Sequence, residues 1–171
     1  LQTKNYFEAI NNLDNAIRLN PNYADSYNNK GIALAEIKKY SDAIINYERA
    51  IKINKNLFNA YINKGVALKN LKKYEKAIEI LNLSIKLNPN NPEVYNNLGN
   101  VFKEQRFFEK AISCYKKAVS LNKDYAYAYN NLGIVLHAQH KYKEAETNYS
   151  KAFSIDKNIE NLLGNKIYNK Q

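Results

Sequence analysis

The sequence is poor in the residues and segments that mark several classes of protein. Cys114 is the single cysteine among 171 residues, so an intrachain disulfide and a cysteine-cluster metal site are both excluded. No run of about 18 apolar residues is present, so no membrane-spanning helix is expected. The first residues lack the basic and then apolar build of a secretory signal. These features favour an intracellular location, either cytoplasmic or nucleocytoplasmic.

Motifs of catalytic sites are also missing. The sequence has no glycine-rich dinucleotide or phosphate loop, no HExxH motif and no serine-containing nucleophile elbow. One helical turn could bring His137 and His140 to a metal, but no carboxylate or thiol clusters beside them as a further ligand. We interpret both as surface histidines. Nothing next to Cys114 marks its thiol as reactive. The chain is therefore predicted to have no active site and to need no cofactor.

What the sequence does contain is a repeat with a spacing of 34 residues. Its four full copies are 24–57, 58–91, 92–125 and 126–159. Residues 1–23 match only the second half of the repeat, which predicts one helix there and an array that continues beyond this chain. Residues 160–171 keep a helical pattern but leave the register, and we expect them to form a capping or junction helix.

Small and aromatic residues recur at fixed positions in these copies. Counting from the first residue of each copy, position 8 is glycine, position 20 is alanine and position 4 is tyrosine. These residues are Gly31, Gly65, Gly99 and Gly133, then Ala43, Ala77, Ala111 and Ala145, then Tyr27, Tyr61, Tyr95 and Tyr129. Glycine inside a helix costs about 1 kcal/mol relative to alanine, so four in register imply a packing reason. We expect two helices to approach closely at that position.

Apolar residues recur three and four positions apart, which predicts two helices in each copy. The first helices are expected at 24–37, 58–71, 92–105 and 126–139, the second at 41–54, 75–87, 109–121 and 143–155, and one more at 4–19. The repeat length and these columns resemble the tetratricopeptide repeat. That resemblance implies an all-α fold, a right-handed superhelix (α-solenoid) of antiparallel helix pairs.

The same resemblance implies that positions 2, 5, 6, 9, 12 and 13 of each first helix line a concave groove. Position 6 is asparagine in every copy: Asn29, Asn63, Asn97 and Asn131. Further asparagines at positions 5 and 9 form a secondary set: Asn28, Asn96, Asn130 and Asn100. An amide both donates and accepts hydrogen bonds, so such a ladder can bind the backbone of an extended chain. The predicted function is therefore a protein–protein interaction module that binds an extended peptide or protein segment in the groove.

Two alternatives remain open for this ladder. Asparagine occurs 29 times in the sequence, so the column can also arise from composition. A second resemblance is to O-GlcNAc transferase and SPINDLY-like glycosyltransferases, whose repeats bind substrate backbone through such asparagines. The stretches YNNLGN at 95–100 and YNNLG at 129–133, with a leucine-leucine-glycine junction at 162–164, resemble that family. The chain would then be the substrate-recruiting arm of a transferase whose catalytic domain it lacks.

Charge and chain ends suggest further partners. The net charge is +10, but the lysines gather at the turn within each pair and on the second helices rather than in the groove. Nucleic acid is therefore an unlikely partner. A carboxylate clamp for acidic tails is rejected, because positions 2 and 5 carry no cations.

The half repeat at the start of the chain predicts that Phe7, Ile10 and Ile17 lose part of their cover. Such an uncovered apolar surface favours end-to-end self-association.

Overall fold

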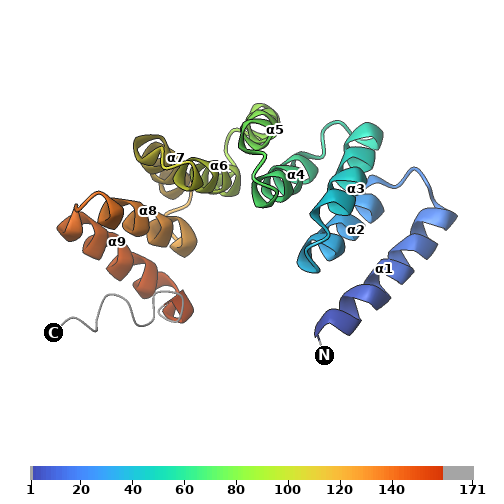
Figure 1. Ribbon diagram of the computed structural model, residues 1–171, viewed down its shortest axis with the longest axis horizontal. Helices are drawn as coiled ribbons and strands as arrows, with labels where there is room; N and C mark the ends of the chain where they lie inside the picture. The colour runs from blue at the N-terminus through green and yellow to red at the C-terminus, as the bar shows by residue number, and fades with distance from the viewer. Residues whose placement is uncertain (1, 160–171) are drawn as a thin grey trace. The chain divides into compact units, whose positions relative to one another are not determined.

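The computed structural model describes residues 2–159, which are helical apart from short connections (Figure 1). The N-terminal helix is α1 (Gln2–Leu19). The first helices of the pairs are α2 (Ala24–Glu36), α4 (Phe58–Asn70), α6 (Pro92–Glu104) and α8 (Ala126–Ala138). The second helices are α3 (Tyr40–Ile53), α5 (Tyr74–Leu87), α7 (Phe108–Leu121) and α9 (Tyr142–Ile155). A short 3-10 helix, η1 (Lys157–Ile159), follows α9.

The predicted helices are confirmed over this range. Each first helix begins at the expected residue, and each second helix begins one residue before it, as α3 does at Tyr40. The fold is all-α and consists of helix pairs, as the repeat pattern predicted. The capping or junction helix expected at 160–171, with its leucine-leucine-glycine stretch, lies outside the described residues.

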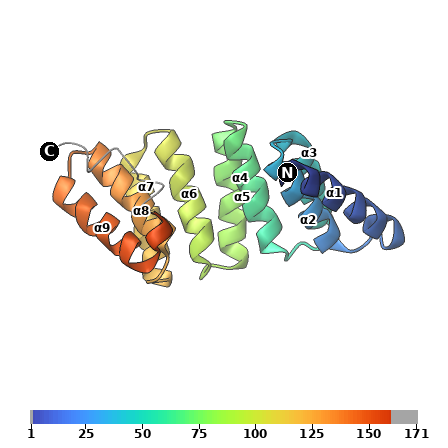
Figure 2. The same cartoon turned by 90° about the horizontal axis from the view of Figure 1, so that it is seen from below.

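The chain forms two compact units, Leu1–Pro89 and Asn90–Gln171. In the first unit α1 packs on α2, α2 on α3, α3 on α4 and α4 on α5. In the second unit α6 packs on α7, α7 on α8 and α8 on α9, and the two helices of the last pair lie side by side in Figures 1 and 2. Within each unit, then, every helix is covered by its neighbours along the chain.

The glycine column marks the closest contact within each pair. A Cβ atom placed on Gly31 would lie 2.5 Å from Cε1 of Tyr47, and one on Gly65 would lie 2.7 Å from Cδ2 of Leu81. A Cβ atom placed on Gly99 would lie 2.5 Å from Cε1 of Tyr115, and one placed on Gly133 would lie 2.5 Å from Cε1 of Tyr149. These distances are too short for any side chain. The glycines are therefore required by packing, as the sequence indicated.

The turn within each pair has a left-handed residue that is not glycine. Lys38 has φ 61°, and its equivalents Lys72, Arg106 and His140 have φ between 58° and 63°. In the first pair the Lys38 N–H donates to the Ala35 carbonyl at 2.9 Å, and the Lys39 N–H donates to the Leu34 carbonyl at 2.9 Å. This is the Schellman arrangement, which satisfies the last carbonyls of a helix. The turn therefore holds its geometry through hydrogen bonds although its central residue is strained.

The connection between pairs is held by asparagine and tyrosine side chains. Oδ1 of Asn54 accepts a hydrogen bond from the Asn56 N–H at 3.0 Å. The Tyr61 hydroxyl donates to the Lys55 carbonyl at 3.1 Å. An asparagine side chain that bonds the backbone two residues on stabilises a turn. The position-4 tyrosine thus fixes the loop that leads into its own helix.

Candidate functional site

The predicted ladder asparagines occupy equivalent places on the four first helices. Asn29 on α2 is exposed, whereas Asn63 on α4, Asn97 on α6 and Asn131 on α8 are partly buried. The residues immediately before three of them behave differently. Asn28, Asn96 and Asn130 are buried, with 6–7% of their surface exposed. The two asparagine columns therefore do not form one surface.

A hydrogen bond joins the two columns between successive first helices. In the first unit, Nδ2 of Asn63 on α4 donates to Oδ1 of Asn28 on α2 at 3.0 Å. In the second unit, Nδ2 of Asn131 on α8 donates to Oδ1 of Asn96 on α6, also at 3.0 Å. The buried acceptor thus orients the amide of the next helix. A position-6 amide held in this way keeps one N–H and its carbonyl oxygen for other partners.

Two members of the buried column depart from this pattern. Ile62 takes the place of asparagine on α4, and its side chain has no group that can accept a hydrogen bond. Asn130 on α8 keeps the amide, but its Oδ1 is buried and has no hydrogen-bond partner among residues 2–159. The column therefore contains one apolar substitute and one unsatisfied acceptor.

In the second unit, other side chains of the chain donate hydrogen bonds to two of the candidate asparagines. The Tyr115 hydroxyl donates to Oδ1 of Asn100 at 2.9 Å, so this secondary-set asparagine is held by the core ring beneath it. Nζ of Lys103 donates to Oδ1 of Asn131 at 3.3 Å. Burial, and then the nearby Cys114 and Glu104, raise the pKa of Tyr115 far above its usual value. The hydroxyl therefore stays a neutral donor.

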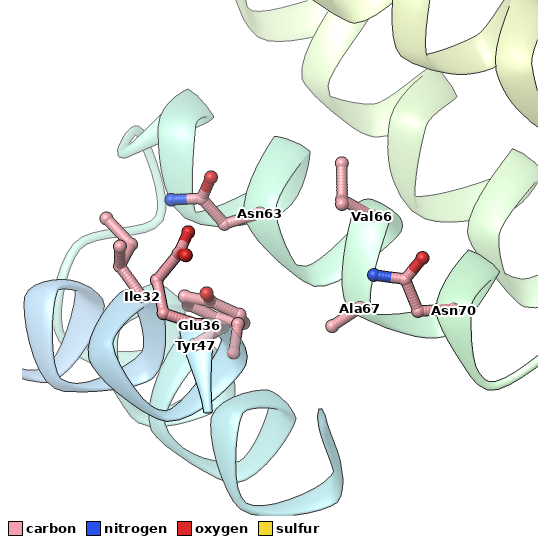
Figure 3. A pocket seen from close by; sticks show the side chains of 8 residues that line it. Ile32, Glu36, Tyr47, Asn63, Val66, Ala67 and Asn70 are labelled. Carbon is pink, nitrogen blue, oxygen red and sulfur yellow. The ribbon is translucent and has the colours of Figure 1, made fainter. Parts of the chain in front are cut away.

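The first unit has an open pocket at the corresponding place, with a volume of about 120 Å³ (Figure 3). It lies between α2, α3 and α4. Its lining residues are Ile32, Ala35, Glu36, Tyr47, Asn63, Val66, Ala67 and Asn70. Burial and the adjacent Glu36 carboxylate raise the pKa of the Tyr47 hydroxyl well above its usual value. The pocket therefore combines apolar walls with a neutral hydroxyl, two amides and one carboxylate.

Four family models match the sequence, and all four describe tetratricopeptide repeats. They match residues 90–158, residues 1–38 and 70–105, residues 24–57, and residues 46–79. Together with the helix pairs and the glycine contacts, these matches decide the family. The chain belongs to the tetratricopeptide-repeat family. It is accordingly a protein–protein interaction module, and the matched models indicate no catalytic domain.

Solved tetratricopeptide structures share the fold of this chain. A structure of MamA from Desulfovibrio magneticus is 25% identical, covers 90% of this chain and 86% of its own, and has a TM-score of 0.75. The Pseudomonas aeruginosa PilF structure is 22% identical, with 91% and 71% covered and a TM-score of 0.79. YrrB, described as having an unusual peptide-binding site, is 20% identical, with 91% and 80% covered and a TM-score of 0.66. No curated protein matches the sequence significantly.

The basic residues of this tetratricopeptide chain lie mainly away from the asparagine columns. The turn lysines Lys38, Lys39, Lys72, Lys73 and Lys141 are exposed, as are Lys76, Lys110, Lys116, Lys117 and Lys151 on the second helices. Lys69 and Lys103 on the first helices are partly buried. These ten exposed lysines therefore lie on the turns and the second helices rather than beside the position-6 amides. That nucleic acid is not a partner stays a prediction.

The remaining candidate groups offer no reactive centre. Burial raises the pKa of the Cys114 thiol to about 11, so the nucleophilic thiolate is disfavoured. His140 lies against Tyr142, with Nδ1 2.7 Å from the hydroxyl, and His137 stacks edge-on against the same ring. Within residues 2–159 no three histidine, cysteine or acidic side chains gather in a way that could hold a metal. None of the helices described there has the length and apolar character of a membrane span.

Sequence reasoning missed the pocket of the first unit. Its one sequence signal is position 12, where the first copy has Ala35 and the later copies have the long side chains of Lys69, Lys103 and His137. A short side chain at that position leaves space above Tyr47. The difference at position 12 indicates a pocket only once the structure shows that the Lys103 side chain reaches the next first helix.

Proposed function

We propose that the chain binds extended peptide segments along the first helices within each unit, through amides of the position-6 asparagines. The observation that carries this proposal is the pair of hydrogen bonds in which buried Asn28 and Asn96 hold Asn63 and Asn131. An amide whose orientation is already fixed loses less entropy when it binds a ligand. The two bonds support backbone binding by Asn63 and Asn131, and we extend the same role to Asn29 and Asn97 by their equivalent positions.

The chemistry of these amides suits a peptide backbone. Each position-6 asparagine can present a donor and an acceptor to one peptide unit, which has one of each. These contacts to the backbone do not distinguish one ligand side chain from another. The amides therefore supply affinity for extended chains in general. We therefore assign backbone binding to Asn29, Asn63, Asn97 and Asn131. Support by hydrogen bonding belongs to the buried asparagines.

A selected peptide tests this proposal. A phage library of random dodecapeptides would yield a ligand, and its affinity would be measured by fluorescence polarisation. Asn29→Ala should weaken binding to the first unit, and Asn97→Ala binding to the second unit, by roughly 2- to 12-fold, the value of one net hydrogen bond. The matched control is Asn82→Ala on α5, which removes an exposed asparagine from a second helix. Equal affinity for all four proteins would refute the ladder.

The glycosyltransferase-arm alternative rests on the sequence resemblance alone. The family models describe repeats, and MamA, PilF and YrrB share the fold of those repeats. The gene sequence downstream of the codon for Gln171 tests this alternative. A nucleotide-sugar-binding domain encoded there would support it, and a stop codon would remove it.

Self-association through α1 is a further proposal. The Phe7 side chain is 53% exposed, whereas Ile10 and Ile17 are partly buried and Ile10 packs against the core of the first unit. Leu19 on the same helix is 82% exposed, and exposed apolar side chains are common contact points between molecules. We infer that α1 provides the surface for contact with a second copy.

A further inference from the structure

We propose that the pocket between α2, α3 and α4 receives a lysine or arginine side chain of the bound peptide. The inference rests on the proposed peptide-binding function, because the pocket lies beside Asn63. It adds a specificity site to a ladder that reads only backbone.

The pocket has the two environments that a long basic side chain needs. Ile32, Val66 and Ala67 form apolar walls that suit the aliphatic stem. The Glu36 carboxylate and the amides of Asn63 and Asn70 can accept hydrogen bonds from a cationic end (Figure 3). Among the described residues, no hydrogen bond or ion pair engages the Glu36 carboxylate. The carboxylate therefore remains available to a ligand.

At the equivalent place in the second unit, the chain itself supplies an ammonium group. There Lys103 on α6 donates from Nζ to Oδ1 of Asn131 on α8. The residues equivalent to Lys103 and Asn131 in the first unit are Ala35 and Asn63. The first unit thus keeps the acceptor and lacks the ammonium. An ammonium supplied by a partner would restore the missing contact.

Charge and size narrow the class of side chain. An acidic side chain would meet the Glu36 carboxylate and be repelled. An apolar one would cover the acceptors of Glu36 and Asn63 without satisfying them. The pocket is small, with a volume of about 120 Å³, which suits the end of a single side chain. A single basic side chain fits all three conditions.

Titration of ¹⁵N-labelled protein with three tripeptides tests the proposal. The probes are N-acetyl-Gly-Lys-Gly-amide and its norleucine and glutamate counterparts. We expect the lysine peptide to shift the side-chain amide signals of Asn63 and Asn70. It should bind about three- to tenfold more tightly than the norleucine peptide, because only its ammonium can pair with the Glu36 carboxylate. The preference is modest because solvent partly screens that carboxylate. The glutamate peptide should bind more weakly than either.

Two variants separate the cation site from a merely apolar hollow. Glu36→Gln should remove the preference for lysine over norleucine. Ala35→Lys should abolish binding by placing an ammonium where Lys103 has one in the second unit. The control is Glu104→Gln, which makes the same charge change at the equivalent position of α6. Equal binding of the lysine and norleucine peptides, no shift of the Asn63 and Asn70 signals, or unaltered binding by Ala35→Lys would overturn the proposal.

Measurements with the selected dodecapeptide distinguish failure of the proposed basic-side-chain pocket from failure of the proposed backbone binding by the position-6 asparagines. If Asn29→Ala weakens that peptide while the lysine tripeptide leaves the pocket signals unchanged, backbone binding stands and the basic-side-chain site is wrong. If the lysine tripeptide binds in the pocket while Asn29→Ala and Asn97→Ala have no effect, the site stands and the ladder is wrong. Thermal unfolding of every variant would confirm that each one is folded.

Discussion

The amide of Asn63 on α4 donates to the side-chain carbonyl of Asn28 on α2 across 3.0 Å, and Asn28 is buried. This bond crosses from one helix pair to the next within the first unit. It shows that an asparagine on a first helix can stabilise the array through its neighbour. For the candidate site we expect that replacing a buried asparagine changes stability, and that replacing a position-6 asparagine changes binding.

The first prediction compares two buried asparagines of the second unit. Asn96→Ile should destabilise by about 1–3 kcal/mol, because it leaves Nδ2 of Asn131 without its acceptor. Asn130→Ile should be neutral or stabilising, since Oδ1 of Asn130 is already unsatisfied and Ile62 shows that isoleucine fits this position. Urea unfolding would measure both. A larger loss for Asn130→Ile than for Asn96→Ile would contradict the assignment.

The second prediction concerns the left-handed turn residues. Lys72 has φ 58°, a conformation that costs a residue with a Cβ atom about 1 kcal/mol and costs glycine little. Lys72→Gly should therefore raise the free energy of unfolding by up to about 1 kcal/mol. Lys73→Gly, at the neighbouring residue before α5, is the control and should not stabilise. Equal effects of the two substitutions would show that the backbone conformation is not the cause.

The third prediction is a loss of stability in alkali. Burial raises the pKa of the Cys114 thiol to about 11, from 9.0 for an unperturbed thiol, and it raises the pKa of Tyr149 to about 12 from 10.0. Groups with a raised pKa favour the folded state fully below their unfolded pKa, and that contribution disappears as pH rises through the folded value. Unfolding free energy should therefore fall between about pH 9 and pH 12. Urea titrations across that range would measure it.

The thiol offers an independent check of the same burial. Cys114 should react with a thiol reagent slowly in the native protein at pH 8 and rapidly after denaturation, because little thiolate forms when the pKa is about 11. Cys114→Ser would remove the reaction altogether and serve as the blank. Native reactivity equal to that of the denatured chain would mean that the thiol is not buried.

The fourth prediction addresses α1. Sedimentation velocity at increasing protein concentration should show association, and Phe7→Ser should reduce it because the exposed ring is removed. Phe153→Ser is a useful comparison, since Phe153 on α9 is 39% exposed and lies at the other end of the described chain. A strict monomer at the highest soluble concentration would rule out self-association through this helix.

Much of the fold could be predicted because the repeat imposes it. The starts of the helices and the close approach at Gly31 follow from residue columns that recur in four copies. Each copy therefore supports the same prediction independently. The candidate site was harder to predict. Asn28 and Asn29 are adjacent asparagines, yet one is buried and the other exposed, because burial depends on how the following helix covers the residue. The pocket beside Asn63 depends on the short side chain of Ala35, which stands out only when the copies are compared.

The contact between Gly31 and the Tyr47 ring has a consequence for how such an array can grow. Both residues belong to the same copy, and the second copy makes the contact with Leu81 in place of the ring. The glycine and its large partner thus lie within one copy. A duplicated gene segment carrying one whole copy would bring a matched glycine and its large partner together. New pairs could then be inserted and diversify on their outward positions while the fit inside each pair is inherited unchanged.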